Sequence, residues 1–376
     1  MKNLMGILFL FLTTLCSSQC VNDWPEFSDT DMSRFNACES VLGTGNVGQL
    51  RLLWSFLPSQ ELVRTSPAVA NGVVYFGTHE GNFYAVNSTT GAEIWERHIG
   101  APFASSPAVG PNLVYFDSGP SLFALHRAAG AVAWKLKTGV SCSSPVVAGD
   151  VVYAAAGCTD GGTIFAVTAK KGKKLWSYTP AGGVAQFVAS PVVADGIVYD
   201  TDMGNNSYAV DARTGNLLWE FSPGGYGGSF GAPAVANGVA FLSSDAGIYA
   251  VDAKSGRQLW GPGNGGGQSS PAVANGILYV GSNQGEGGIY ALNTANGSVL
   301  WNFNTSGSDD SPAVANGVVY EAGYDGYLYA LDATSGEALW NYNLELGGAN
   351  PASSPAEAKS TVYVGGPKGV YAFGLK

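Results

Sequence analysis

The sequence predicts an all-β protein, an eight-bladed β-propeller whose blades are four-stranded antiparallel sheets. A segment of about 40 residues recurs along the chain, and most copies end in a hairpin like ALDATSGEALW at 330–340. Only 12% of the 376 residues are charged while Gly contributes 53, and no long segment has the apolar period of a helix. Repeats of this length are typical of propellers and other repeat architectures.

The first three strands of each repeat follow from a shared pattern. A Ser-Pro-Ala-Val element comes first, and a short turn, usually Asn-Gly, predicts a hairpin to a second strand such as VVYFG at 73–77. A polar loop and a third strand such as LYALD at 328–332 come next. The repeats begin at Ser66, Ser106, Ser144, Ser190, Ala232, Ser270, Ser311 and Ser354.

The fourth strand follows an Asp-x-Thr-Gly turn and carries a tryptophan four residues after the glycine. Asp and Thr side chains can bond the turn amides, and glycine takes the positive φ that the turn needs. Burying one Trp contributes roughly 2–3 kcal/mol, so we interpret these residues as contacts between blades. They are Trp54, Trp95, Trp134, Trp176, Trp219, Trp260, Trp301 and Trp340.

The number of strands predicts how the ring closes. Three-strand units occur eight times, but only seven are followed by a tryptophan strand, and the chain ends at VYAFGLK. The missing strand is NVGQLRLLWSF near the N-terminus, which carries Trp54. Completing the last blade with this strand closes the ring and removes exposed edges. We therefore expect the propeller at 46–376, after an N-terminal segment at 19–45.

The N-terminus, MKNLMGILFLFLTTLCSSQC, has a basic start, a short apolar run and small residues. Because the apolar run is too short to span a bilayer, we predict a secretory signal peptide at 1–18 and no transmembrane segment. The mature chain would then be extracellular or periplasmic. Lipidation at Cys16 or Cys20 is a weaker alternative, since Leu15 and Gln19 are poor residues before such a cysteine.

Export permits disulfides. Cys142 and Cys158 flank a predicted hairpin that places them nearly opposite each other, and Cys20 would then pair with Cys38. A metal pair formed by Cys142 and Cys158 is the competing interpretation, but no histidine lies near them in the sequence. No metal site is predicted.

The formal net charge of −10, without an evident cluster of Lys or Arg, argues against nucleic acid or an anionic membrane surface as a partner. Acidity of this kind keeps a glycine-rich repeat protein soluble, and we expect a monomer.

The hairpins resemble the repeat of pyrroloquinoline-quinone-type (PQQ-type) propellers, whose signature is Ala-x-Asp-x-x-Thr-Gly-x-x-x-Trp. AVDARTGNLLW at 209–219 matches it almost letter for letter, while ALHRAAGAVAW at 124–134 keeps only the frame. Members of this family include quinoprotein dehydrogenases and the propeller lipoprotein of the outer-membrane barrel-assembly machinery. The resemblance therefore implies the fold and leaves the function open.

Quinoprotein dehydrogenases hold their quinone over an aromatic floor, with Ca²⁺ bound by Glu and Asn, an aspartate base and usually a disulfide between adjacent cysteines. This chain has no adjacent Cys pair, and its tryptophans are only 39–43 residues apart, which leaves little room for pocket-building insertions. The haem attachment pattern Cys-x-x-Cys-His is absent. The site residues therefore do not support PQQ with Ca²⁺, the cofactor stays unknown, and no catalytic residue is predicted.

Strand direction predicts a turn face and a loop face, and the family resemblance implies that ligands bind at the loop face. The two aspartates among the candidates could hold a cation or be solvated loop residues. The two aromatic candidates could stack on a planar or sugar ligand or close the channel. The candidates are Asp309, Asp310, Tyr226, Phe230, Gln268 and His79.

These observations favour a secreted binding or scaffold propeller that presents its loop face to a protein or glycan. Short loops and missing quinone-site residues favour this function over catalysis. A compact PQQ-dependent alcohol or sugar dehydrogenase is the first alternative, and an outer-membrane protein assembly factor is the second.

Overall fold

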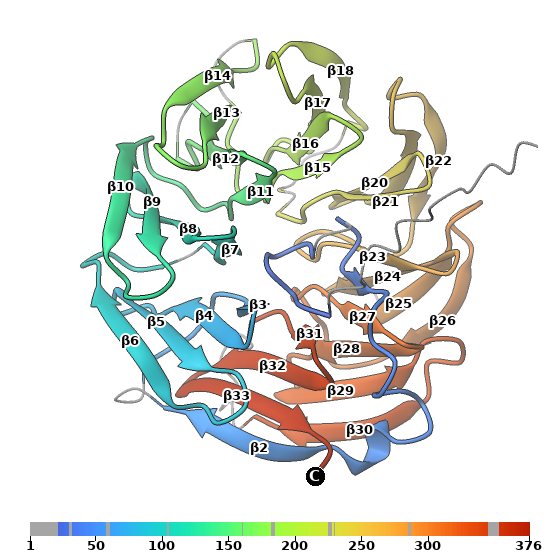
Figure 1. The fold of residues 1–376 in the computed structure, drawn as a ribbon. Helices are drawn as coiled ribbons and strands as arrows, with labels where there is room; N and C mark the ends of the chain where they lie inside the picture. Colours follow the sequence, from blue (N-terminus) through green and yellow to red (C-terminus); the bar gives the residue numbers. More distant parts are fainter. Residues whose placement is uncertain are drawn as a thin grey trace, which may run out of the picture.

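Eight antiparallel sheets surround a central axis in the computed structural model, which confirms the predicted eight-bladed propeller (Figure 1). The structure describes residues 22–29, 32–57, 61–103, 105–159, 161–181, 185–224, 228, 230–284, 287–344 and 353–376. Within these parts of the chain, no helix has the length and apolar character needed to cross a bilayer. In the described part of the chain, one 3-10 turn, η1 (Val47–Gln49), precedes the first outer strand.

Each blade runs from a short inner strand to a long outer strand. The inner strands are β3 (Ala68–Ala70), β7 (Ala108–Val109), β11 (Val146–Ala148), β15 (Val192–Ala194), β19 (Ala234–Ala236), β23 (Ala272–Ala274), β27 (Ala313–Ala315) and β31 (Ala356–Ala358). The second strands are β4 (Val73–Gly77), β8 (Leu113–Ser118), β12 (Val151–Ala156), β16 (Ile197–Thr201), β20 (Val239–Ser244), β24 (Ile277–Ser282), β28 (Val318–Ala322) and β32 (Thr361–Gly366).

The remaining strands complete the blades. The third strands are β5 (Asn82–Asn87), β9 (Ser121–His126), β13 (Thr163–Thr168), β17 (Ser207–Asp211), β21 (Gly247–Asp252), β25 (Gly288–Asn293), β29 (Tyr327–Asp332) and β33 (Gly369–Gly374). The outer strands are β2 (Arg51–Phe56), β6 (Glu93–His98), β10 (Val132–Lys137), β14 (Lys174–Tyr178), β18 (Leu217–Phe221), β22 (Gln258–Gly263), β26 (Val299–Phe303) and β30 (Ala338–Asn343).

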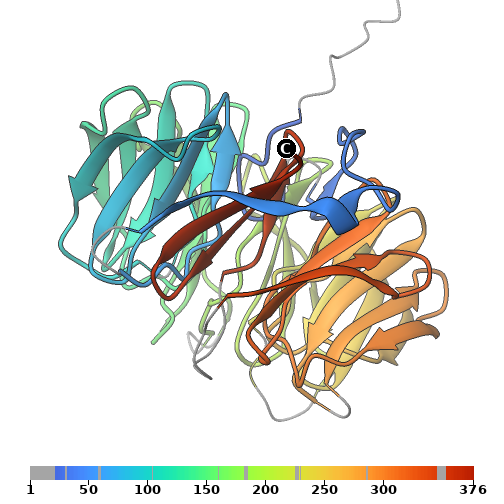
Figure 2. The ribbon, with the colours of Figure 1, turned by 90° about the horizontal axis from the view of Figure 1, so that it is seen from below.

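The N-terminal strand β2 closes the ring, as predicted. It pairs antiparallel with β33, the third strand of the last blade, and places Trp54 opposite Ala372 (Figure 2). This pairing joins the two ends of the chain in one sheet. The last blade therefore has four strands, as each of the first six blades does.

The outer-strand tryptophans connect neighbouring blades. In blades with a following hairpin, the indole Nε1 donates to a carbonyl in that hairpin's turn, for example from Trp219 to Ala253 O at 2.9 Å. The turn glycine lies so close to the indole that a Cβ on Gly256 would be 2.8 Å from the ring of Trp219. Trp340 instead donates to Leu50 O, just before β2, at the point where the ring closes.

Residues 22–29 and 32–36 cross the middle of the ring, where Figure 1 draws the chain in dark blue. The short strand β1 (Phe35–Asn36) pairs in parallel with the inner strand β27. Other hydrogen bonds to the inner strands are Val69 N to Trp24 O (2.6 Å), Val109 N to Pro25 O (2.8 Å), Val235 N to Met32 O (3.3 Å), Val273 N to Ser33 O (2.8 Å) and Val314 N to Arg34 O (3.0 Å). We call residues 22–29 and 32–36 the channel segment.

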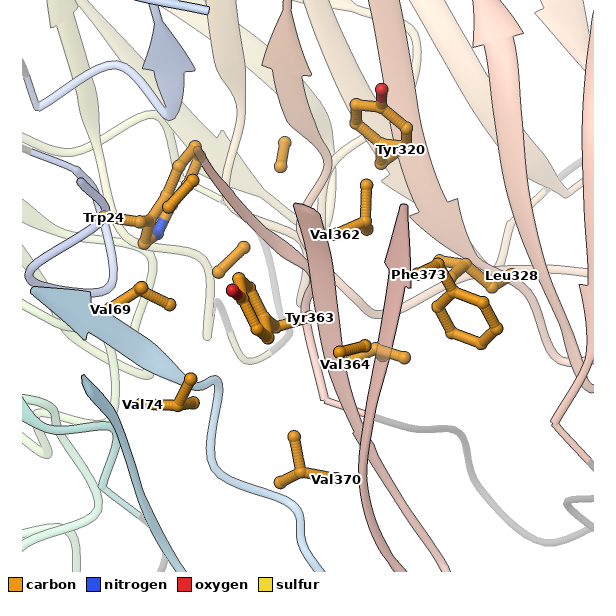
Figure 3. Packing of buried hydrophobic residues seen from close by; sticks show 14 of the residues in the cluster. Trp24, Val69, Val74, Tyr320, Leu328, Val362, Tyr363, Val364, Val370 and Phe373 are labelled. Carbon is orange, nitrogen blue, oxygen red and sulfur yellow. The ribbon is translucent and has the colours of Figure 1, made fainter. Parts of the chain in front are cut away.

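The hydrophobic core lies between blades and reaches the channel segment. Trp24 is fully buried in a cluster with Val69, Tyr363 and Phe373, part of which is shown in Figure 3. This cluster combines residues from the N-terminal channel segment, the first blade and the last blade. The apolar contacts that hold the channel segment therefore also support the closure of the ring.

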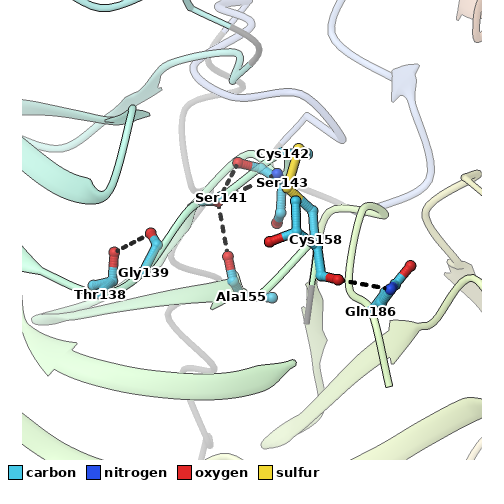
Figure 4. The surroundings of a disulfide bond; sticks show 9 residues. Thr138, Gly139, Ser141, Cys142, Ser143, Ala155, Cys158 and Gln186 are labelled. Carbon is cyan, nitrogen blue, oxygen red and sulfur yellow. Dashed lines mark hydrogen bonds between the residues drawn. A yellow bond between two sulfur atoms is a disulfide. The ribbon is translucent and has the colours of Figure 1, made fainter. Parts of the chain in front are cut away.

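Cys142 and Cys158 form a disulfide with their Cα atoms 5.9 Å apart (Figure 4). Cys142 precedes β11 and Cys158 follows β12, so the bond ties together two loops on the loop face. The predicted disulfide between Cys20 and Cys38 cannot be described, because Cys20 lies outside the described residues. The predicted signal peptide also lies outside them.

Candidate functional site

The Ser-Pro pairs form a ring of hydrogen bonds around the loop end of the central channel. In each bond the amide of one blade donates to the serine Oγ of the next blade. The bonds join Ser66 to Ser106 (2.9 Å), Ser106 to Ser144 (2.9 Å), Ser144 to Ser190 (3.0 Å), Ala232 to Ser270 (2.8 Å), Ser270 to Ser311 (2.9 Å) and Ser311 to Ser354 (3.0 Å). The seven hydroxyls of these pairs donate no hydrogen bond to any described residue.

The ring is interrupted at two places among the described residues. One is the fifth blade, where Ala232 replaces the serine, and the other is between the last and first blades, where the Ser354 amide does not bond Ser66 Oγ. The Ser190 amide consequently has no acceptor among the described residues. We expect Ala232→Ser to raise the free energy of unfolding by about 0.5–1.5 kcal/mol, because it supplies this acceptor. Ser270→Ala should instead lower it by about 1–3 kcal/mol, since the buried amide of Ala232 loses its acceptor. Urea unfolding followed by tryptophan fluorescence measures both changes. If both substitutions changed the free energy of unfolding in the same direction, the result would contradict a stabilising role of the ring.

A cavity of about 160 Å³ lies inside this serine ring. Phe27 of the channel segment contributes to its lining, together with Arg64 and Cys142. Four of the six predicted ligand-face residues line the same cavity, namely Asp309, Asp310, Phe230 and Gln268. The site therefore combines hydroxyls, an amide, two carboxyls and two aromatic rings.

The paired aspartates have different surroundings. Asp309 accepts hydrogen bonds from Asn283 Nδ2 at 2.8 Å and from the Tyr324 hydroxyl. Burial raises the pKa of Asp309, and these two hydrogen bonds oppose the rise. Asp310 Oδ2 is buried and has no partner among the described residues. Burial raises the pKa of Asp310 well above its ordinary value, and the charge of Asp309 adds to the rise. Asp310 is thus the carboxyl with an acceptor atom left unbonded.

The other two ligand-face candidates are not part of this cavity. His79 is exposed and does not line it. The third strand of the first blade begins just after His79 and leaves it on the rim of the loop face. Tyr226 lies outside the described residues. Within those residues, no group of three or more His, Cys, Asp or Glu side chains is placed to hold a metal ion.

The sequence did not reveal Arg34 of the channel segment, a buried basic residue near this site. Its guanidinium donates to Phe27 O, Ser311 O, Pro312 O and Pro355 O, and it lies 4.5 Å from the centroid of the Phe27 ring. Burial lowers the pKa of Arg34, and the charges of Glu321, Asp29 and Asp310 oppose that effect. No repeat pattern includes Arg34, so a search for motifs passes over it.

Glu321 lies beside Arg34 on β28 and is completely buried. Burial raises its pKa well above the ordinary value, although Ser308 and Arg34 oppose the rise. The Ser308 hydroxyl bonds both Glu321 Oε1 and Ala322 O. Because that hydroxyl has one proton, a protonated Glu321 can donate the second bond. Burial and the charge of Arg34 therefore act in opposite directions on the pKa of Glu321.

The cavity does not fit a pyrroloquinoline quinone. Its volume is well below the roughly 300 Å³ at which pockets for drug-sized ligands begin, and this quinone is a tricyclic tricarboxylic acid. The described lining offers Arg64 as its one basic side chain for the three carboxylates. The arrangement instead suits water or a small polar molecule.

Comparison with protein families gives one match that spans the propeller. The family model described as outer membrane protein assembly factor BamB matches residues 46–260 and 244–375. These two ranges together include every blade.

Two characterised proteins share part of the sequence. Tetrathionate hydrolase of Acidithiobacillus ferrooxidans is 29% identical over 169 residues, which are 40% of this chain and 34% of that protein. Quinoprotein alcohol dehydrogenase PedH of Pseudomonas putida is 28% identical over 158 residues, which are 36% of this chain and 27% of that protein. The matched segments thus span about a third of these relatives.

Solved structures share the fold at low sequence identity. BamB from Moraxella catarrhalis has a TM-score of 0.71 and 18% identity, with 87% of this chain and 98% of that chain covered. Quinohemoprotein alcohol dehydrogenase from Comamonas testosteroni has a TM-score of 0.77 and 16% identity, with coverages of 94% and 80%. At these identities the likeness concerns the fold alone, which hosts both assembly factors and enzymes.

Proposed function

Because this chain belongs to the family of the outer membrane protein assembly factor BamB, we propose that it is a non-catalytic propeller that binds a protein partner through its loop face. The observation that carries the proposal is the state of the central channel. The channel segment crosses it, and the cavity left at the loop end is about 160 Å³. A channel filled in this way at its loop end favours binding at the surface of the loop face over catalysis inside that end of the channel.

The rim of the loop face has features of a protein-binding surface. Phe230, Val140 and Leu57 are large apolar residues that are 37%, 46% and 48% exposed, and each lies in a loop that leads to a new blade. Exposed aromatic and aliphatic residues with polar neighbours are common at protein interfaces. The disulfide between Cys142 and Cys158 fixes one of these loops, which lowers the entropy lost on binding.

The experiment compares the two faces by site-specific photo-crosslinking in the protein's own host. One variant carries a photoreactive amino acid at Gln268 on the loop face, and the matched control carries it at Arg213, which is exposed on a turn-face hairpin. We expect one defined adduct from position 268, identified by mass spectrometry as a protein, and none from position 213.

Two results would contradict the proposal. An adduct from position 213 alone would assign binding to the turn face. Saturable, Ca²⁺-dependent binding of PQQ at one molecule per chain, measured by calorimetry on the purified protein, would revive the dehydrogenase alternative.

A further inference from the structure

Basic residues are concentrated in one part of this acidic chain. Residues 127–174 contain seven Lys and Arg residues but only two Asp and no Glu, although the whole chain has a net charge of −10. The expectation that basic residues form no cluster is therefore wrong. The seven are Arg127, Lys135, Lys137, Lys170, Lys171, Lys173 and Lys174.

Packing between blades brings the lysines of two outer strands to one part of the rim. The turn from β13 to β14 carries three of them, and Lys174 begins β14. This turn packs on Trp134 of β10, whose Nε1 donates to Ala169 O at 2.9 Å. A Cβ on Gly172, in the middle of that turn, would lie 2.6 Å from the indole. Lys135 and Lys137 follow Trp134 on the same strand. Figure 1 shows β10 and β14 as neighbours on the outer edge. We call these six lysines the lysine rim.

The positive charges of the lysine rim are not neutralised locally. All six lysines are exposed. One ion pair forms among the described residues, between Lys359 and Asp23 at 3.0 Å. It involves none of the six lysines of the lysine rim. Three other hairpin turns begin with an aspartate, namely Asp211, Asp252 and Asp332, whereas the turn of the third blade begins with Thr168.

Exposed aliphatic side chains lie among these lysines. Leu175 is 49% exposed next to Lys174, and Val132 is 41% exposed at the start of β10. The pairing of β13 with β14 has a bulge at Leu175, between Lys174 and Trp176, which disfavours addition of another strand to this edge. Lys provides a mobile point charge without the bidentate geometry of Arg, which suits a diffuse array of negative charges.

We propose that the lysine rim docks the propeller on an anionic phospholipid surface. Lysines near such a surface are attracted by its negative potential, and adjacent exposed aliphatic residues can enter the interface between headgroups and chains. The anionic surface would repel the acidic remainder of the molecule and attract the lysine rim. The propeller would therefore bind with blades 2 and 3 facing the bilayer. This inference is independent of the partner proposed for the loop face.

The test measures co-sedimentation with vesicles of phosphatidylcholine alone or mixed with phosphatidylglycerol, at low and high salt. The variant is K170Q/K173Q, and the matched control is K254Q/R257Q, which removes two charges at the equivalent positions of the fifth-blade turn. Each lysine contributes roughly fivefold to the partition coefficient, so we expect about a 25-fold loss for K170Q/K173Q and less than about a twofold change for the control. Binding should weaken with salt.

Three results would overturn the proposal. These are equal binding to vesicles with and without phosphatidylglycerol, an equal loss in both variants, or wild-type binding to polyglutamate without binding to anionic vesicles. The last result would assign the lysine rim to an acidic polypeptide. Circular dichroism melting of both variants ensures that a lost signal does not reflect unfolding.

Discussion

Replacing Arg34 with alanine is expected to lower the free energy of unfolding by about 3–5 kcal/mol, the range for removing one partner from a buried ionic network. Arg34 is 1% exposed, and its guanidinium bonds four carbonyls, three of which belong to the Ser-Pro segments of blades 7 and 8. The variant leaves these carbonyls without their donor. It also removes the positive charge that faces Glu321 and Asp310.

The measurement combines urea unfolding with amide hydrogen exchange. Exchange should become faster at Val273 and Val314, whose amides bond the channel segment at Ser33 O and Arg34 O. Arg34→Lys keeps the charge but loses the planar fork, so its effect should be intermediate. Arg51→Ala changes an exposed arginine on β2 and should alter stability by less than about 0.5 kcal/mol. An Arg34→Ala variant as stable as Arg51→Ala would contradict the anchoring role.

The sequence did not predict this anchoring role of Arg34, although it predicted the blades. The blades were predictable because each one repeats the same strands, turns and tryptophan, and the closing strand was predictable from the strand that the last repeat lacks. The channel segment has no repeat partner in the sequence, so nothing in residues 22–36 indicates contact with inner strands that begin up to 320 residues later. Its position depends on tertiary contacts such as Trp24 with Val69 and Arg34 with Pro355.

The candidate site was partly accessible from the sequence. Strand direction placed Phe230, Gln268, Asp309 and Asp310 on one face, and the structure brings them to one cavity. The same reasoning could not separate them from His79, because it gives the face of a loop but not its distance from the axis. The hydroxyl ring was also missed, since Ser-Pro was treated as the start of a strand. A residue type that recurs at the inner end of every blade is a signal that could have revealed it.

Replacing Trp219 with alanine is expected to destabilise the protein by about 3–5 kcal/mol, the cost of deleting a large buried aromatic side chain. The indole is 7% exposed, donates to Ala253 O at 2.9 Å and is covered by Gly256 of the next blade. Its neighbours include Tyr199, with ring centroids 5.9 Å apart. The cavity left by alanine would open the contact between blades 4 and 5.

Leu218 provides the matched control, because it precedes Trp219 on the same strand but is 47% exposed at the bulge. Leu218→Ala should change the free energy of unfolding by less than about 0.5 kcal/mol in the same urea titration. Equal effects of the two substitutions would show that the outer strand, and not the indole, joins the blades. A large loss for Trp219→Ala alone would mean that the repeated tryptophan stabilises each contact between blades. This explains why a tryptophan occurs in all eight outer strands, since every blade in a closed ring packs against two neighbouring blades.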